Sequence, residues 1–339
     1  MAYIKRQYYH YLIASGAGLF VALLGRFVFA TNYFNDAGGL LMLCFLLLIP
    51  AALGAVTAHF TPRTASRWWR LVFGPFLTVL LFLVTALLFH LEGMICVLMI
   101  FPLFIITAGL GALLYYDLTK DKSDQTKTYV VATFALLPFV LAPVESQLTT
   151  PDEYRRVENT IVIAAPAEVV WKHIVRVPPI TAQDLGPSLV DRLGFPRPVE
   201  ATLSHEGVGG VRRATFERGV EFLETIDVWE PQRRISFSIV PNTATIPPTT
   251  FDEHVTVGGR FFDVLRGTYE LEPAGPGRTR LVLYSQQRLS TRINPYAGLW
   301  TGYIMSEIQR RILEVIRRRC ETEAAGATPA LAANQKARH

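Results

Sequence analysis

The chain has 339 residues, of which 50% are hydrophobic and 18% charged, and its formal net charge is +5. This length favours two domains, and no block of Lys and Arg interleaved with aromatic residues indicates a nucleic-acid-binding face. The three cysteines, Cys44, Cys96 and Cys320, lack the spacing of a zinc site or a disulfide framework. The histidines show no ligand spacing either, so we expect no metal and no other cofactor.

The first 148 residues consist of long apolar runs with few charges. A helix needs about 20 apolar residues to cross the hydrocarbon core of a bilayer, so we predict a transmembrane domain over residues 1–148 with about five helices. The last run is the shortest and contains Pro138 and Pro143, and the number of crossings depends on it. The predicted helices cover residues 9–30, 38–58, 70–90, 93–116 and 129–147.

Basic residues occur only in alternate connections between these runs. They are Lys5, Arg6, Arg63, Arg67, Arg70, Lys120, Lys122 and Lys127. Short basic connections are retained in the cytoplasm, which predicts a cytoplasmic amino terminus. Five crossings then place the rest of the chain outside the cytoplasm, whereas four would place it inside; we favour five.

Arg26 is the main charged residue within the apolar runs. Charges inside a membrane are functional candidates by default. Arg26 lies within about a turn of the predicted outer end, however, and we expect its side chain to extend to the interface. We therefore interpret this half as an anchor.

From Arg155 to about residue 320 the sequence changes to short segments bounded by Gly and Pro, which is typical of antiparallel strands. The expected order is a strand, short helices, about six strands and one long helix over 294–319. The helix carries apolar residues every four positions. They are Trp300, Ile304, Ile308, Ile312 and Ile316. A sheet that buries one face against one long helix must curl around it.

Five segments of this half carry a family resemblance: VIAAPAEVVW, GVGGVRRATF, FLETIDVWEPQRRISFSI, GTYELEPAGPGRTRLVLYSQQRL and NPYAGLWTGYIMSEIQRRILEVI. They resemble the START-like superfamily, and most closely its bacterial polyketide cyclase/dehydrase and lipid-transport (SRPBCC-type) domains. The likeness covers about residues 155–320. It implies an α+β helix-grip fold, in which a curved antiparallel sheet wraps the last helix and encloses a hydrophobic cavity. It also implies apolar ligands, with catalysis in only some members. Residues 1–148 resemble no family that we recognise.

Glu224 is the candidate catalytic residue. It shares a strand face with Phe222, Ile226 and Val228, and a carboxyl group on an apolar face has a raised pKa. The alternative is that Glu224 pairs with an arginine at the rim of the sheet. The predicted ligand-binding residues are Trp171, Arg213, Glu224, Tyr269, Tyr284, Trp300, Tyr303 and Ile304.

Three functions are compatible with this sequence. We favour a membrane-anchored domain that binds a lipid or another hydrophobic small molecule, for transfer or sensing, in a bacterial inner membrane. The second is a cyclase, dehydratase or hydrolase acting on a membrane-soluble substrate. The third is a docking or sensor protein whose cavity is filled by its own side chains. The Ala-rich segment 321–339 has no hydrophobic face, and we predict it to be disordered.

Overall fold

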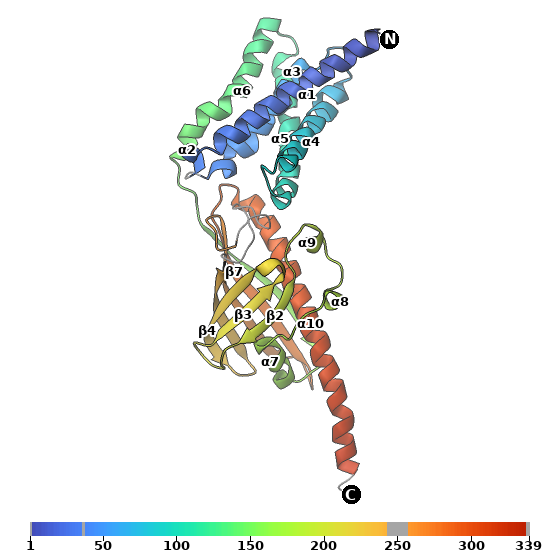
Figure 1. Ribbon diagram of the computed structural model, residues 1–339, viewed down its shortest axis with the longest axis vertical. Helices are drawn as coiled ribbons and strands as arrows, with labels where there is room; N and C mark the ends of the chain where they lie inside the picture. The colour runs from blue at the N-terminus through green and yellow to red at the C-terminus, as the bar shows by residue number, and fades with distance from the viewer. Residues whose placement is uncertain (1, 36–37, 243–256, 337–339) are drawn as a thin grey trace. The chain divides into compact units, whose positions relative to one another are not determined.

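The computed structural model describes residues 2–35, 38–242 and 257–336. The chain forms two compact units, which Figure 1 shows as a helical unit and a unit built on a sheet. The helical unit comprises Met1–Pro151 and the short segment Thr291–Ile293. The second unit, which we call the grip unit, comprises Asp152–Ser290 and Asn294–His339.

The helical unit consists of long helices interrupted by short irregular turns. In chain order these are α1 (Ala2–Phe29), α2 (Asn32–Asn35), the 3₁₀ turn η1 (Gly39–Leu41), the π-helical turn η2 (Cys44–Leu48), α3 (Ile49–Phe60), the π-helical turn η3 (Trp69–Phe73), α4 (Gly74–Leu88), α5 (Met94–Thr119) and α6 (Asp124–Ser146).

Within the described residues, four helices are long and apolar enough to cross a membrane: Tyr9–Phe29, Trp69–Leu88, Met94–Thr119 and Asp124–Ser146. The run around 129–147 is thus a full-length helix that passes through both of its prolines. The run over 38–58 instead forms a shorter apolar helix, Cys44–Phe60. Gly38 has a φ of 109° and cannot continue a helix, so the regular part begins later than the hydropathy suggests.

One end of the helical unit is defined by contacts between its loops. Arg63, between α3 and α4, pairs with Asp124 at the start of α6. The ring of Tyr11, near the start of α1, lies 5.2 Å from that of Trp69 at the start of η3. The amino-terminal part of α1, the end of α3, and the starts of α4 and α6 therefore share this end.

The opposite end is defined by two carboxylates, of which Glu145 is buried and Glu92 is partly buried. Glu92, between α4 and α5, lies 2.5 Å from Arg26 near the end of α1. Arg26 therefore has an ion-pair partner within the protein, in place of the expected extension to the interface. The carboxylate of Glu145, at the end of α6, accepts hydrogen bonds from the backbone N–H groups of Leu43 (2.6 Å) and Cys44 (2.8 Å). Successive long segments thus alternate in direction, and α6 ends opposite the start of α1.

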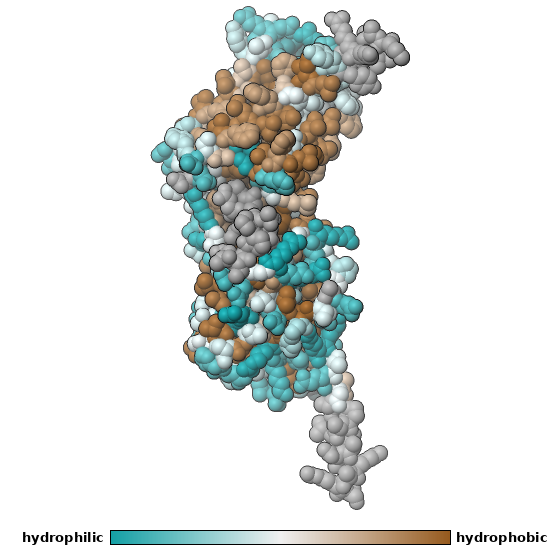
Figure 2. Space-filling view, viewed as in Figure 1, coloured by the Kyte–Doolittle hydropathy of each residue, from teal (hydrophilic) through white to brown (hydrophobic). Residues whose placement is uncertain are grey.

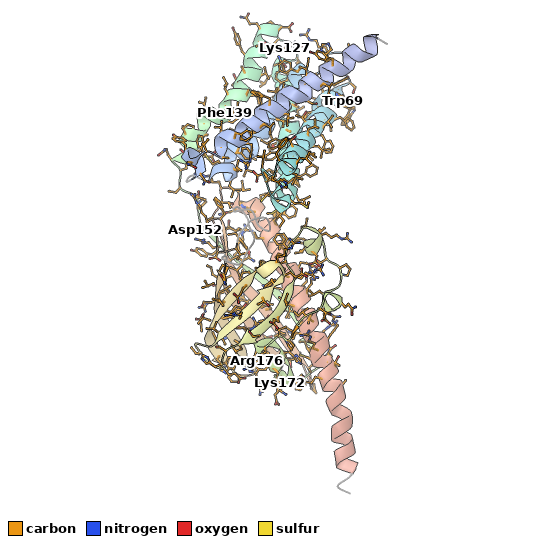
Figure 3. All side chains as sticks on the ribbon, viewed as in Figure 1. Trp69, Lys127, Phe139, Asp152, Lys172 and Arg176 are labelled. Atoms are coloured by element: carbon orange, nitrogen blue, oxygen red, sulfur yellow. The ribbon has the colours of Figure 1, made fainter. Side chains whose placement is uncertain are left out.

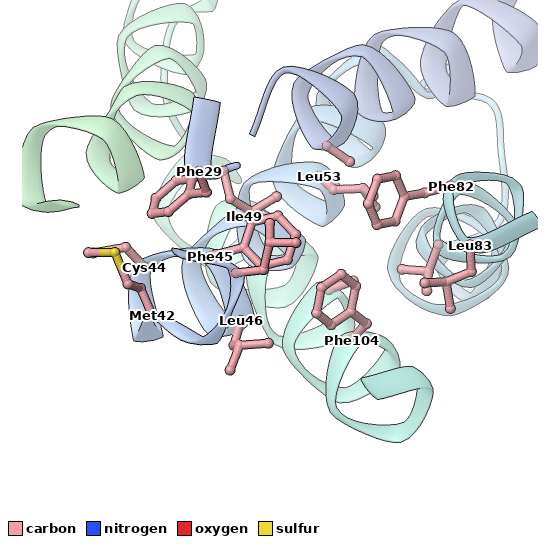
Figure 4. Packing of buried hydrophobic residues seen from close by; sticks show 14 of the residues in the cluster. Phe29, Met42, Cys44, Phe45, Leu46, Ile49, Leu53, Phe82, Leu83 and Phe104 are labelled. Carbon is pink, nitrogen blue, oxygen red and sulfur yellow. The ribbon is translucent and has the colours of Figure 1, made fainter. Parts of the chain in front are cut away.

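The core of the helical unit is tightly packed, as Figure 4 shows for Phe29, Ile49, Phe82 and Phe104. Helices α3 and α5 approach closely at Gly54, because this residue has no side chain. A Cβ at this position would lie 1.9 Å from the carbonyl oxygen of Ala108. Small residues permit such contacts between membrane helices. The outer surface is also apolar (Figure 2), with exposed side chains that include Leu12, Phe20, Phe27, Val84, Leu113 and Val140.

The grip unit contains, in its described part, seven antiparallel strands and one long helix. Its elements are β1 (Glu153–Ile163), α7 (Ala167–Val175), α8 (Ala182–Leu185), α9 (Leu189–Arg192), β2 (Pro198–Leu203), β3 (Val211–Phe216), the 3₁₀ turn η4 (Glu217–Gly219), β4 (Glu221–Glu230), β5 (Arg234–Asn242), β6 (Phe262–Pro273), β7 (Thr279–Leu289) and α10 (Asn294–Lys336). The strand order is β1-β7-β6-β5-β4-β3-β2.

The sheet curls along α10, and their facing sides form one core (Figure 1). That core joins Ile163, Ile235 and Leu281 of the sheet to Leu313 and Ile316 of α10. An antiparallel sheet with one apolar face buries it most completely by wrapping a single long helix. The helix-grip architecture predicted from the sequence is therefore confirmed.

Two features of α10 differ from expectation. The helix continues to Lys336, so residues 321–336 are helical where we predicted disorder, and alanine has the highest helix propensity. The face buried against the sheet contains Ile304, Gln309, Leu313 and Ile316, whereas Ile308 is only half-buried. Because each residue turns the helix by 100°, a strict four-residue stripe drifts by about 40° at every step.

Candidate functional site

An ion pair is buried on the inner face of the sheet. Arg212 of β3 lies directly opposite Glu224 of β4 in the antiparallel register. Their side chains form a salt bridge, with only 4% of Arg212 and 7% of Glu224 exposed. Ala214 and Ile226 flank the pair on the same face, because alternate residues of a strand share a face. The arrangement places two charges on an otherwise apolar surface.

Aromatic rings surround the guanidinium group. Its central carbon lies 5.5 Å from the ring centre of Phe237 and 5.9 Å from that of Tyr269. The Phe237 ring has room because its neighbour across the strands is Gly267, where a Cβ would lie 2.5 Å from the ring. These contacts hold the guanidinium in place, although its Nε has no hydrogen-bond partner among the described residues.

Burial controls the ionisation of this group of side chains. It raises the pKa of the Glu224 carboxyl above its ordinary value, while the positive charge of Arg212 acts in the opposite direction. Burial also raises the pKa of the Tyr269 hydroxyl. The Tyr269 hydroxyl therefore stays protonated at neutral pH and can donate a hydrogen bond.

A second polar cluster joins α10 to the sheet. Gln309 donates to the Ser285 hydroxyl at 3.0 Å and to the carbonyl of Val157 at 3.3 Å, and it accepts from Asn159 at 2.8 Å. The Ser306 hydroxyl donates to Asn159 at 3.1 Å. Every polar atom of the Gln309 amide thus has a partner, and the cluster fixes α10 against β1 and β7.

The structure brings only some of the predicted site residues together. Glu224 and Tyr269 lie close to each other on the inner face, and Ile304 is buried on α10. Figure 3 labels Lys172 of α7. The residue before it in the sequence, Trp171, packs edge-on against Trp229 at a ring separation of 5.1 Å. Trp229 is five residues further along β4 than Glu224, so Trp171 contacts a different part of the sheet.

The remaining predicted residues lie elsewhere. Arg213 is exposed and pairs with Glu221 at 2.9 Å, and Tyr284 donates to Glu270 at 3.0 Å. Both project from the outer face of the sheet because each directly follows or precedes an inward-facing residue. On α10, Tyr303 is 41% exposed and Trp300 is partly exposed. We therefore do not include Arg213 and Tyr284 in the site.

Arg212 is the residue that sequence reasoning missed. It stands next to Arg213 in the sequence, and alternation alone does not show which of the two faces inward. The register decides this, because Arg212 is opposite Glu224 and Arg213 is opposite Leu223. Among the residues that the structure describes, no group of three or more His, Cys, Asp or Glu side chains is placed to hold a metal ion.

Several solved structures are similar to about half of this chain. A START superfamily protein from Mycobacterium smegmatis is 12% identical, with 49% of this chain and 97% of that chain covered and a TM-score of 0.33. The Zhui aromatase/cyclase from Streptomyces sp. R1128 is 20% identical, with 51% and 94% covered and a TM-score of 0.29. DynU16, from the dynemicin biosynthetic locus, is 18% identical, with 51% of this chain covered and a TM-score of 0.31; this chain spans about half of its length (49%).

No protein-family model matches the chain, and neither does the sequence of any curated protein. The helix-grip description therefore rests on the strand order and on the core that the sheet shares with α10.

Proposed function

We propose that the grip unit binds a hydrophobic small molecule over the inner face of its sheet, and that the apolar helices hold it at a membrane. The observation that supports this proposal is the Arg212–Glu224 pair. Desolvating two charges costs several kcal/mol per ion, and apolar residues at the same positions are often equally or more stable. A pair kept on an apolar face, with one guanidinium nitrogen lacking a partner, suits the polar end of an otherwise apolar ligand.

The test is to identify what the full-length protein retains during purification in detergent. The sample is analysed by native mass spectrometry and by extraction with organic solvent. We expect a bound apolar molecule, and we expect the double variant Arg212→Met/Glu224→Leu to retain it at least about tenfold less, as the loss of about 1.4 kcal/mol of binding free energy implies.

The matched control is Arg213→Met/Glu221→Leu. This pair joins the same two strands but lies on the outer face of the sheet, where Arg213 is exposed. It should leave retention unchanged. The absence of any apolar molecule from the wild-type protein, or an equal loss in both double variants, would contradict the proposed function.

A second candidate function is acid–base catalysis on such a ligand. It is favoured by the raised pKa of Glu224, since a carboxyl group whose pKa is shifted toward neutrality is a better general acid, and Tyr269 can serve as a hydrogen-bond donor beside it. Glu224→Gln separates the two functions. Loss of turnover with binding retained would indicate an enzyme, whereas an intact ligand recovered from both forms indicates a binding protein.

We also propose an orientation in the membrane. The end of the helical unit that contains Arg63 and Asp124 also carries the basic loops, whereas the connections at the opposite end lack Lys and Arg within 31–37 and 89–93. Basic loops are retained in the cytoplasm, so the chain leaves α6 on the extracytoplasmic side. A reporter enzyme that is active only outside the cytoplasm should be active when it is fused after His339. Activity of a reporter that works only in the cytoplasm, fused at the same position, would contradict the proposed orientation.

A further inference from the structure

The side chain of Gln287, in β7, is completely buried, yet its amide makes no hydrogen bond to the residues that the structure describes. Its exposed fraction is 0%, and neither its Oε1 nor its Nε2 has a partner among the described residues. Buried polar side chains almost always have partners, so each exception requires an explanation. The contrast with Gln309, whose amide is fully satisfied in the same unit, shows that the fold can satisfy a buried amide.

The side chain of Gln287 faces α10. Leu283 and Ser285 precede it at two-residue intervals on β7; Leu283 belongs to the core shared with α10, and Ser285 bonds to Gln309. Side chains at two-residue spacing lie on the same face of a strand. The unpartnered amide therefore lies on the face of the sheet that packs against α10.

The two cross-strand neighbours of Gln287 do not hydrogen-bond its amide. They are Val264 of β6 and Arg155 of β1. Val264 has no polar side-chain atom, and Arg155 is engaged with Glu153 at 2.7 Å and packs against Gly298 of α10.

Small residues of α10 lie at this level of the interior. Thr301 is one helical turn beyond Gly298, and its buried hydroxyl also has no hydrogen-bond partner in the described ranges. At Gly302 a Cβ would meet no atom within 4 Å.

Gln287 and the Arg212–Glu224 pair lie at about the same level across the sheet. Glu224 of β4 lies opposite Ile239 of β5. The residue before Ile239, Ser238, lies opposite Arg266 of β6, which is two residues from Val264, the β6 neighbour of Gln287. Three strand spacings separate β4 from β7, or about 14 Å along the sheet. Apolar side chains, Ile239 and Val264, occupy the interval between the two polar positions.

We propose that Gln287 binds a neutral group of the ligand that both donates and accepts hydrogen bonds, as a carboxamide does. This inference rests on the proposed function. Two amides can form a pair of hydrogen bonds that satisfies Oε1 and Nε2 together. An ester offers only acceptors and a carboxylate does the same, so either leaves Oε1 without a donor. The ligand class is thus an apolar chain or ring system that carries an amide-like group.

The experiment is a competition between two probes of equal chain length, decanamide and methyl decanoate. Full-length protein in one detergent is offered both, and the bound ratio is read by native mass spectrometry. We expect the wild type to prefer decanamide by about tenfold or more and Gln287→Met to show a ratio near one, since one net hydrogen bond corresponds to about that factor. The matched control is Gln286→Met, because Gln286 is exposed on the other face of the same strand.

Each outcome decides the assignment. A preference that is absent from the wild type, or that persists in Gln287→Met, overturns the role of Gln287 while leaving ligand binding in place. Failure of every form to bind either probe contradicts the proposed function itself. Gln287→Leu is measured in parallel, and binding of methyl decanoate by either variant shows that it is folded.

Discussion

Each unit of this protein buries a carboxylate beside an arginine, but the two are satisfied differently. Glu145 of the helical unit accepts from two backbone N–H groups and lies 3.4 Å from Arg292, which also donates to the Glu145 carbonyl at 2.6 Å. Among the described residues, Glu224 of the grip unit accepts only from the Arg212 side chain and receives no backbone hydrogen bond. A saturated carboxylate stabilises the fold, whereas an unsaturated pair has capacity left for a ligand.

The same difference separates the two buried glutamines of the grip unit. Gln309 connects α10 to β1 and β7 through a complete set of hydrogen bonds. Gln287 makes none. Both side chains are buried, so burial does not distinguish a structural residue from a candidate binding residue in this protein. The distinction lies in whether the polar atoms of the side chain have hydrogen-bond partners.

Replacement of Glu145 should have the largest effect on stability. Glu145→Leu removes the acceptor of two backbone N–H groups and leaves Arg292 without its carboxylate, so we expect a loss of at least about 5 kcal/mol in the free energy of unfolding. Unfolding in mixed micelles measures it. Asp124→Leu is the control, because that carboxylate is exposed and the ion pair of an exposed carboxylate contributes little to stability. Equal losses in both variants would refute the comparison.

Breaking the buried pair of the grip unit should come next. Arg212→Met leaves the Glu224 carboxylate uncompensated, and we expect a loss of about 3 kcal/mol. Adding Glu224→Leu should recover most of that loss while still abolishing ligand retention. The same micellar unfolding assay measures both variants. A double variant as unstable as the single one would show that the pair is structural, like Glu145.

Replacing the two buried glutamines should change the stability of the protein in opposite directions. Gln287→Met removes unsatisfied polar atoms and should stabilise the ligand-free protein by about 1–3 kcal/mol, whereas Gln309→Met leaves Asn159 and Ser285 without their partner and should destabilise it by a similar amount. Thermal unfolding of ligand-free samples gives the two shifts. Destabilisation by both substitutions would mean that Gln287 is satisfied in solution.

The pH dependence of stability should reflect Glu224. Its pKa is raised in the folded state, so the folded protein binds the proton more tightly than the unfolded chain, whose glutamates titrate near pH 4.3. The free energy of unfolding should therefore fall as pH rises from about 4.3 to the folded pKa, by at most about 1.4 kcal/mol per pH unit. Unfolding of the wild type and Glu224→Gln between about pH 4 and 8 isolates this slope, and parallel curves would contradict it.

The smallest effect concerns Cys320 of α10. The thiol is fully buried, and burial raises its pKa to about 12, so at pH 8 only about one molecule in ten thousand carries the thiolate, the nucleophilic form. We expect no labelling by iodoacetamide in the folded protein and complete labelling after denaturation, both read by mass spectrometry. Rapid labelling of the native protein would show that α10 separates readily from the sheet.

Local sequence patterns predicted much of the architecture. Hydropathy located the apolar helices, with the run over 38–58 shortened because Gly38 interrupts its start. The alternating segments and the long closing helix predicted the helix-grip unit. The site was predicted less well: Glu224 and Tyr269 were named and are buried together, but Arg213 and Tyr284 project outward.

What the sequence by itself determined about this protein is its division into an apolar helical half and a half with a curled sheet around one helix, since burial periodicity is a local property. What only the tertiary structure decided is which polar atoms find partners. Arg212 and Arg213 are adjacent and chemically identical, as are Gln286 and Gln287. Strand register chooses the inward member of each pair, and the register depends on residues far away along the chain.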